Sequence, residues 1–206
     1  MLEPERILRL EDDSVVFLDQ RRLPLEEIDV ECRTAAEVAD AIRTMVVRGA
    51  PAIGVAAAYG IALAAAHGED LQDADRVLRE SRPTAVNLAW ALDTMRDDLS
   101  YEHARRIHTD EVERCRRMAA HTAALLAPGT RALTHCNAGG LATGGYGSAV
   151  GALLAAWERG LLEHVWVNET RPLLQGARLT PPHSCSRAAG LSWPARPRQR
   201  LKMAPL

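Results

Sequence analysis

The segment from Pro51 to Ala66 constrains the fold of this chain more than any other, because it contains no charged residue over its whole length. It is dominated by alanine and is shorter than the roughly 20 apolar residues that cross a bilayer. We therefore predict a buried helix, with Pro51 in its first turn and Gly68 just beyond its end. The chain is expected to have no membrane-spanning part.

The composition is that of an ordinary globular protein. Of 206 residues, 47% are hydrophobic and 25% charged, and the net charge of -2 argues against nucleic-acid binding. With one Phe and three Tyr, the core must be built from small aliphatic side chains, which favours a mostly α or an α/β class. Four Cys without a CxxC pair predict reduced thiols in the cytoplasm, with neither disulfides nor a metal site.

The sequence predicts that residues 1–127 form a helical domain with a small β element. Residues 14–19 and 23–30 favour a short hairpin that turns at Gln20-Arg21-Arg22. Thr34 and Glu37 form a capping-box pattern ahead of a helix. The expected helices span residues 35–46, 51–67, 71–80, 84–98 and 102–126.

A second pattern begins near residue 128. Residues 131–137 suit a strand, 139–147 a glycine-rich loop, 148–159 a helix and 164–169 another strand. This βαβ order predicts a Rossmann-like parallel domain, residues 128–180, with ligands at the carboxyl ends of its strands. Two strands are too few to complete such a sheet, so the domain is expected to be incomplete.

After Thr180 the composition changes. Residues 181–206 contain five Pro and five basic residues but no acidic one, and they lack helical or strand periodicity. We interpret them as a disordered tail, such as an out-of-frame reading of a GC-rich gene produces. The alternative is a natural basic linker or interaction arm.

Arg48-Gly49-Ala50-Pro51 is the first candidate for chemistry. Free backbone N–H groups at a helix start attract anions, and an adjacent arginine adds charge and donors. The same residues also suit a plain turn between helices.

Cys136, in Thr134-His135-Cys136-Asn137, is the second candidate. It lies at the end of a predicted strand before a glycine loop and helix, where a reactive thiol is favoured, although a buried structural cysteine fits the position equally well. The loop that follows does not meet the GxGxxG spacing, so no nicotinamide cofactor is expected.

The third candidate is Glu169 to Gly176, at the end of the second strand. Arg171 and Gln175 can donate hydrogen bonds to hydroxyl or phosphate oxygens, although a surface arginine and a capping glutamine are equally simple interpretations.

Together these segments resemble the methylthioribose-1-phosphate isomerase family, within the superfamily that includes regulatory subunits of the translation initiation exchange factor. The matching stretches, which cover most of residues 35–180, are MVVRGAPAIGVAAAYGIALA, RPTAVNLAWAL, LTHCNAGGLATGGYGSAVG and VWVNETRPLLQGARLT. The resemblance implies conversion of 5-methylthioribose 1-phosphate to 5-methylthioribulose 1-phosphate in methionine salvage, without a cofactor, by a homodimer when full length.

The resemblance also implies roles for individual residues. Cys136 is the implied catalytic thiol. Its aspartate partner, from a downstream Gly-Ala-Asp segment of the family, is absent from this sequence. The implied substrate-binding residues are Arg48, Gly49, Ala50, Arg82 and Gln175.

Loss of an acid/base group typically costs around 10²- to 10⁴-fold in rate, so we expect these 206 residues to be an inactive fragment. Two alternatives remain. One is a non-catalytic regulatory or binding protein of the same superfamily, and the other is an isomerase of ribose 1,5-bisphosphate, whose second phosphate replaces the methylthio group.

Overall fold

The computed structural model describes residues 2–184, which form helices around two small sheets. The helices are α1 (Pro4–Ile7), α2 (Ala35–Arg43), α3 (Ala50–His67), α4 (Leu71–Ser81), α5 (Val86–Met95), α6 (Tyr101–Ala124), α7 (Gly140–Thr143), α8 (Ala149–Glu158) and α9 (Gln175–Ser184). The strands are β1 (Leu8–Leu10), β2 (Val15–Leu18), β3 (Asp29–Cys32), β4 (Thr130–His135) and β5 (Leu162–Asn168). The mixed α/β class is the one that the sequence predicted.

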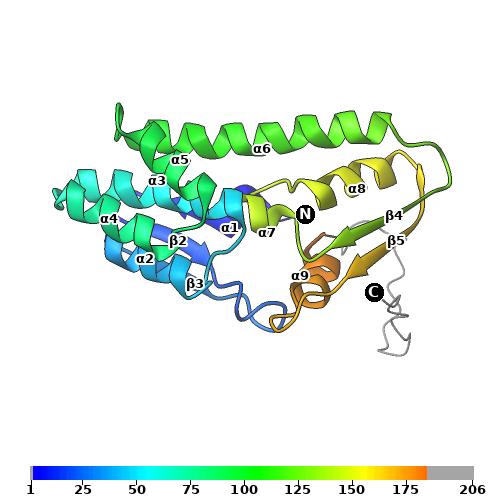
Figure 1. The fold of residues 1–206 in the computed structure, drawn as a ribbon, viewed down its shortest axis with the longest axis horizontal. Helices are drawn as coiled ribbons and strands as arrows, with labels where there is room; N and C mark the ends of the chain where they lie inside the picture. The colour runs from blue at the N-terminus through cyan, green and yellow to red at the C-terminus, as the bar shows by residue number, and fades with distance from the viewer. Residues whose placement is uncertain (1, 185–206) are drawn as a thin grey trace.

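Helix α3 is the central element of the structure, as its lack of charge predicted. Every residue from Ala52 to Ala64 is buried. The helix packs against α2, α4, α5, α6, α7 and β2, which surround it in Figure 1. By length and composition it resembles a membrane span, but 72% of its 18-residue apolar window is buried inside the protein. Its apolar surface is therefore covered by the rest of the chain.

Helix α2 begins as the capping box predicted and ends earlier than expected. The Thr34 side chain accepts a hydrogen bond from the Glu37 backbone N–H at 3.2 Å. The helix stops at Arg43 rather than at residue 46, because Met45 adopts a left-handed φ of 64°. This break turns the chain so that buried Val46 and Val47 lead into the start of α3.

The N-terminal sheet differs from the simple hairpin that the sequence predicted. Strands β2 and β3 do pair antiparallel, but β1 adds a third strand on the other side of β2. The expected strand over residues 23–30 is wrong for most of its length, because residues 23–28 belong to the connection. Pro24 offers no N–H to a ladder, and Leu25 is 89% exposed. Only Asp29 and Val30 of that segment join β3.

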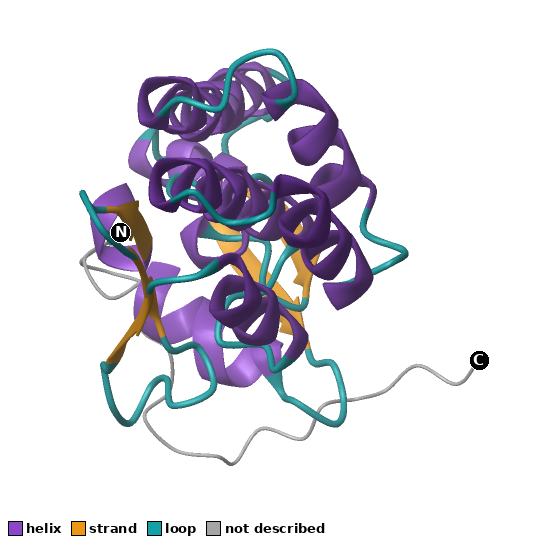
Figure 2. Cartoon of the chain, turned by 90° about the vertical axis from the view of Figure 1, so that its left-hand side faces the viewer, coloured by secondary structure: helices purple, strands orange, loops and turns teal. Residues whose placement is uncertain are grey.

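The second sheet confirms the predicted βαβ unit. Strands β4 and β5 pair in parallel, with Arg131 opposite His164 and Leu133 opposite Trp166. In the end-on view of Figure 2, several helices are seen down their axes and the strands form two separate groups. One face of the pair packs against α8, while Leu133 (62% exposed) and Trp166 (41% exposed) lie on the other.

Helix α6 belongs to both hydrophobic cores. Its first half contributes Ala104 and Ile107 to the main core around α3. Its second half contributes Ala119 and Ala123 to a smaller core with α8 and β5. Figure 1 shows the same helix extending over both parts of the molecule. The two cores therefore meet along α6, and the expected domain boundary after residue 127 stays a prediction.

Helix α9 was not predicted and extends beyond the expected end of ordered structure. It runs from Gln175 to Ser184, four residues past Thr180. Glu169 accepts hydrogen bonds from the backbone N–H groups of Gly176 and Ala177, and so satisfies free donors at the helix start. Residues 185–206, the rest of the expected disordered tail, lie outside the described residues.

A buried histidine connects α6 to the glycine-rich loop. His108, 7% exposed, has its Nε2 2.5 Å from the Gly144 carbonyl and its Nδ1 2.7 Å from the Tyr59 hydroxyl. Because a carbonyl only accepts, Nε2 carries the proton, and in the neutral ring Nδ1 accepts from Tyr59. Burial lowers the pKa of His108, while the bond to Gly144 and the charge of Glu5 oppose this shift.

This lowered pKa predicts a loss of stability in mild acid. Below pH about 6.5 the unfolded chain binds a proton at this histidine more readily than the folded chain does, so the free energy of unfolding decreases as pH falls. His108→Gln keeps an amide donor for Gly144 but cannot titrate. In urea unfolding at pH 7.5 and 5.5, the substitution should reduce the pH-dependent shift in midpoint. Thr109→Val, at an exposed site on the same helix, adds and removes no titratable group and should leave the shift at its wild-type size.

Candidate active site

The structure brings Arg48 and Cys136 together from opposite parts of the chain. The Nη1 atom of Arg48 lies 3.7 Å from the Cys136 sulfur, although 88 positions separate them in the sequence. Arg48 lies just before α3, and Cys136 immediately follows β4, at the carboxyl end of the parallel pair. This is the edge at which the βαβ pattern predicted ligands.

The backbone at Cys136 explains why β4 ends one residue before it. Cys136 has a φ of 60°, which is uncommon for a residue with a side chain. Its N–H still donates to the Asn168 carbonyl of β5 at 3.0 Å, so the turn begins directly at the strand end. The half-buried thiol lies beside the Arg48 guanidinium.

The guanidinium of Arg48 is partly enclosed and incompletely bonded. Its Nη2 donates to the backbone carbonyl of Asn137 at 2.8 Å and to the side-chain oxygen of Asn137 at 3.2 Å. Within residues 2–184, its Nε is buried without a hydrogen-bond partner. Burial lowers the pKa of Arg48, Cys136 raises it, and the nearby charge of Arg178 lowers it. Because an arginine stays protonated at neutral pH, these contacts place a cation with a spare donor beside the thiol.

Gly49 allows α3 to begin close to the glycine-rich loop. Its φ of 99° is rarely adopted by other residues, and a Cβ at this position would lie 2.4 Å from the Ala142 carbonyl oxygen. No side chain caps the start of α3. The exposed Ala50 and the first turn therefore present backbone donors and the positive end of the helix dipole. Arg48, Gly49 and Ala50 thus lie together at the helix start as an anion-attracting segment, and binding of substrate there stays a prediction.

Sequence analysis missed two buried polar residues at this site, Asn137 and Thr180. The Asn137 side chain donates to the Thr180 hydroxyl at 3.1 Å, and that hydroxyl donates to the Cys136 carbonyl at 2.8 Å. Asn137 was visible as a polar residue directly after the candidate cysteine. Thr180 gave no signal, because the helix that carries it was not predicted.

The structure leaves two predicted site residues less directly connected to Cys136. In the described residues, no hydrogen bond joins Arg82 to this group, and Arg82 Nε is buried without a partner. The segment after Arg82 does approach α3, because Asn87 packs against Gly54. Gln175 accepts from the Thr170 hydroxyl at 2.6 Å at the start of α9. Substrate contacts of Arg82 and Gln175 remain predictions.

Arg178 holds α9 against the N-terminal part of the chain. Its guanidinium donates to the Leu23 carbonyl at 2.6 Å and makes longer bonds to the carbonyls of Gln20 and Arg21. Gln20 in turn donates through its side chain to the Leu141 carbonyl of α7 at 2.8 Å. The loop after β2 therefore bonds both to α9, which carries Thr180, and to α7, which lies next to Gly49.

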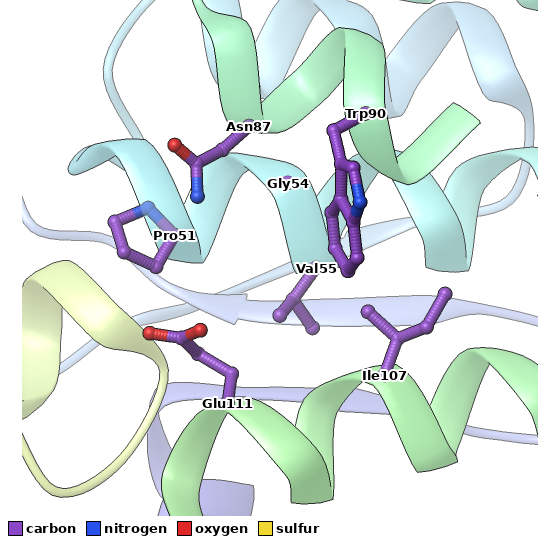
Figure 3. Close-up of a pocket in the computed structure, with 7 residues that line it drawn as sticks. All are labelled: Pro51, Gly54, Val55, Asn87, Trp90, Ile107 and Glu111. Atoms are coloured by element: carbon purple, nitrogen blue, oxygen red, sulfur yellow. The ribbon is translucent and has the colours of Figure 1, made fainter. Parts of the chain in front are cut away.

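Two other hollows among the described residues are poorer candidates for a ligand site. One cavity of about 10 Å³ lies between α3, α5 and α6, where Asn87 and Trp90 of α5 point toward α3 and Glu111 of α6 lies below Pro51 (Figure 3). That volume accommodates at most about one water molecule. A larger, open hollow of about 380 Å³ lies beside Ala65 and Tyr101 and has few polar groups. Neither contains the convergent donors found at Arg48 and Cys136.

Gly49→Ala should strongly destabilise the protein, because the new methyl group would collide with backbone atoms of Ala142. We expect a loss of about 2–4 kcal/mol in the free energy of unfolding. Gly129→Ala is the matched control, since Gly129 also has a positive φ of 80° but nothing lies near its would-be Cβ. That variant should lose only about 1 kcal/mol. Equal losses in urea titrations would show that the approach of α3 to α7 is not tight.

Comparison with curated proteins identifies relatives that are named methylthioribose-1-phosphate isomerase. Methylthioribose-1-phosphate isomerase from a strain of Thermus thermophilus is 57% identical over 185 residues, covering 85% of this chain and 56% of the relative. The protein of the same name from Geobacter sulfurreducens is 46% identical, covering 85% of this chain and 57% of the relative. The chain thus spans little more than half the length of the relatives it matches.

Solved structures and a family model agree with these matches. The structure of 5-methylthioribose 1-phosphate isomerase from Pyrococcus horikoshii OT3 superposes with a TM-score of 0.73 at 34% identity, covering 87% of this chain and 58% of that one. The delta subunit of initiation factor eIF-2B from A. fulgidus superposes with a TM-score of 0.69 at 39% identity, with coverages of 84% and 57%. The model of the Initiation factor 2 subunit family matches residues 46–186. The chain therefore belongs to the Initiation factor 2 subunit family.

Proposed function

We propose that this chain forms the part of a methylthioribose-1-phosphate isomerase that binds the sugar phosphate and carries the catalytic thiol. The reaction would convert 5-methylthioribose 1-phosphate to 5-methylthioribulose 1-phosphate. The contact of Arg48 with Cys136, in a chain 57% identical to a relative of that name, is the observation that supports the proposal best.

The anion-attracting segment suits the phosphate of such a substrate. The phosphate would lie at the start of α3, where backbone N–H groups and the Arg48 guanidinium can donate to its oxygens. The sugar ring attached to it would then extend toward Cys136, because the sulfur lies 3.7 Å from the same guanidinium. Arg82 and Gln175 are proposed as further substrate contacts.

The reaction requires acid/base groups rather than an external oxidant. Phosphate on the anomeric oxygen prevents simple ring opening, so cleavage of the ring C–O bond must be assisted. Hydrogen then moves from C2 to C1, which oxidises C2 to a ketone and reduces C1 within the same molecule. Cys136 is proposed as one of the proton-transferring groups. No cofactor is needed, because the electrons stay in the substrate.

The Gly-Ala-Asp segment, which the family resemblance implies as the source of a second acid/base residue, does not occur in residues 1–206. We therefore propose that these 206 residues bind the substrate but turn it over slowly or not at all. The complete enzyme is proposed to be a cytoplasmic homodimer that binds neither nucleic acid nor membrane.

Substrate binding can be measured directly on this chain. Isothermal titration with 5-methylthioribose 1-phosphate should show binding, and Arg48→Met should weaken it about tenfold or more, because a charge-assisted hydrogen bond contributes roughly 1.5–3 kcal/mol. Arg43→Met, at an exposed site on α2, should bind like wild type. Ribose 1,5-bisphosphate serves as the competing ligand. Tighter binding of the bisphosphate would favour the rival isomerase.

Turnover can be measured in a chimera that joins residues 1–180 to the remaining part of the Thermus thermophilus relative. The chimera should form the ketose product, and Cys136→Ala should lower its rate by roughly 10²- to 10⁴-fold. Cys32→Ala, which removes a thiol on β3, is the control and should retain most of the activity. A folded chimera that binds substrate without turnover would favour the regulatory or binding protein instead.

A further inference from the structure

Asn137 and Thr180 complete a closed circuit of contacts around Cys136. The Arg48 guanidinium approaches the Cys136 sulfur through Nη1 and bonds to Asn137 through Nη2. Asn137 donates to Thr180, and Thr180 donates to the Cys136 carbonyl. The circuit therefore returns to the residue at which it began, and it joins three elements, the start of α3, the end of β4 and α9.

The two residues that close this circuit, Asn137 and Thr180, lie where water cannot readily replace lost hydrogen bonds. Asn137 is 4% exposed and Thr180 is 2% exposed. The Thr180 hydroxyl uses its single proton on the Cys136 carbonyl and accepts from the Asn137 amide, so its direction is fixed by both neighbours. A buried network of this kind, with each member bonded on both sides, holds its groups more rigidly than separate pairs do.

The circuit also supports a backbone conformation that is unfavourable by itself. A non-glycine residue at a φ of 60° is strained, and the surrounding structure must hold it there. The bond from Thr180 to the Cys136 carbonyl fixes the peptide plane after the cysteine. The bond from Cys136 N–H to Asn168 fixes the plane before it. Both peptide planes that determine the direction of the thiol are thus hydrogen-bonded.

We propose that Asn137 and Thr180 are positioning residues, which hold the Cys136 thiol and the Arg48 guanidinium at a fixed separation. Their importance for catalysis rests on the proposed isomerase function, whereas the positioning itself can be tested without substrate. Thr180 acts through the backbone of Cys136, and Asn137 acts through the orientation of Arg48. Among the described residues, no hydrogen bond joins either of them to the sulfur, whose bonded partner is Arg48.

The test compares alkylation of Cys136 by iodoacetate and by iodoacetamide. These reagents differ mainly in charge, so the ratio of their rate constants reports the positive potential at the sulfur. The ratio is measured on the full chain at one pH, and mass spectrometry of the tryptic peptide that contains Cys136 separates its label from those of the other cysteines. Thr180→Val, which keeps the shape but removes the hydroxyl, should lower the ratio about threefold to fivefold.

Two substitutions distinguish positioning from a general loss of structure. Thr180→Ser retains the hydroxyl and should restore the wild-type ratio. Thr143→Val removes a buried threonine hydroxyl that accepts from the Gly147 N–H, away from the circuit, and should destabilise the protein without changing the ratio. Circular dichroism checks that each variant is folded. If Thr180→Val does not fold, Asn137→Ser provides the same comparison.

An unchanged ratio in a folded Thr180→Val or Asn137→Ser variant would overturn the proposal. An equal decrease of the ratio in Thr143→Val and Thr180→Val would also overturn it, because the effect would then follow from any loss of a buried hydroxyl. The outcome is independent of the proposed function. If the chain fails to bind the sugar phosphate but shows the expected ratios, the proposed isomerase function is contradicted. The positioning role of Asn137 and Thr180 is then still supported.

Discussion

The close approach between the start of α3 and the loop after β4 is the contact on which the rest of the structure depends. Gly49 lets the backbone of α3 meet α7 at a distance that no side chain would permit. Arg48, one residue earlier, can then reach Cys136 and Asn137. Without this approach the helical part and the βαβ unit would still share α6, but the guanidinium and the thiol would be separated.

The elements that sequence analysis predicted correctly are those with a strong local pattern. The uncharged run that became α3 has few alternatives to burial, and the change from strand to glycine loop to helix identified the βαβ unit. Cys136 was located at a strand end because the apolar run of β4 stops there. Its pairing with Arg48 was not visible locally, since the two residues come from separate motifs, and only the family resemblance placed them in one site.

The elements that sequence analysis missed depend on distant contacts. Helix α9 has no apolar stripe at its start, and it is stabilised by Glu169 at its N-terminus and by Arg178 bonds to the loop after β2. Pro24 and the exposed Leu25 keep residues 23–28 out of the first sheet, whereas the hydrophobic pattern alone favoured a strand. The role of Thr180 follows from α9, so it could not be inferred before that helix was known.

The position of Thr180 within the chain has a consequence for the order of events during synthesis. The ribosome makes Arg48 and Cys136 well before residue 180, and the helical part around α3, which is rich in local contacts, can begin to fold during that interval. The hydroxyl that fixes the Cys136 carbonyl arrives only with α9. The thiol is therefore held in its final direction only once α9 has been made, after the core around α3 has begun to form.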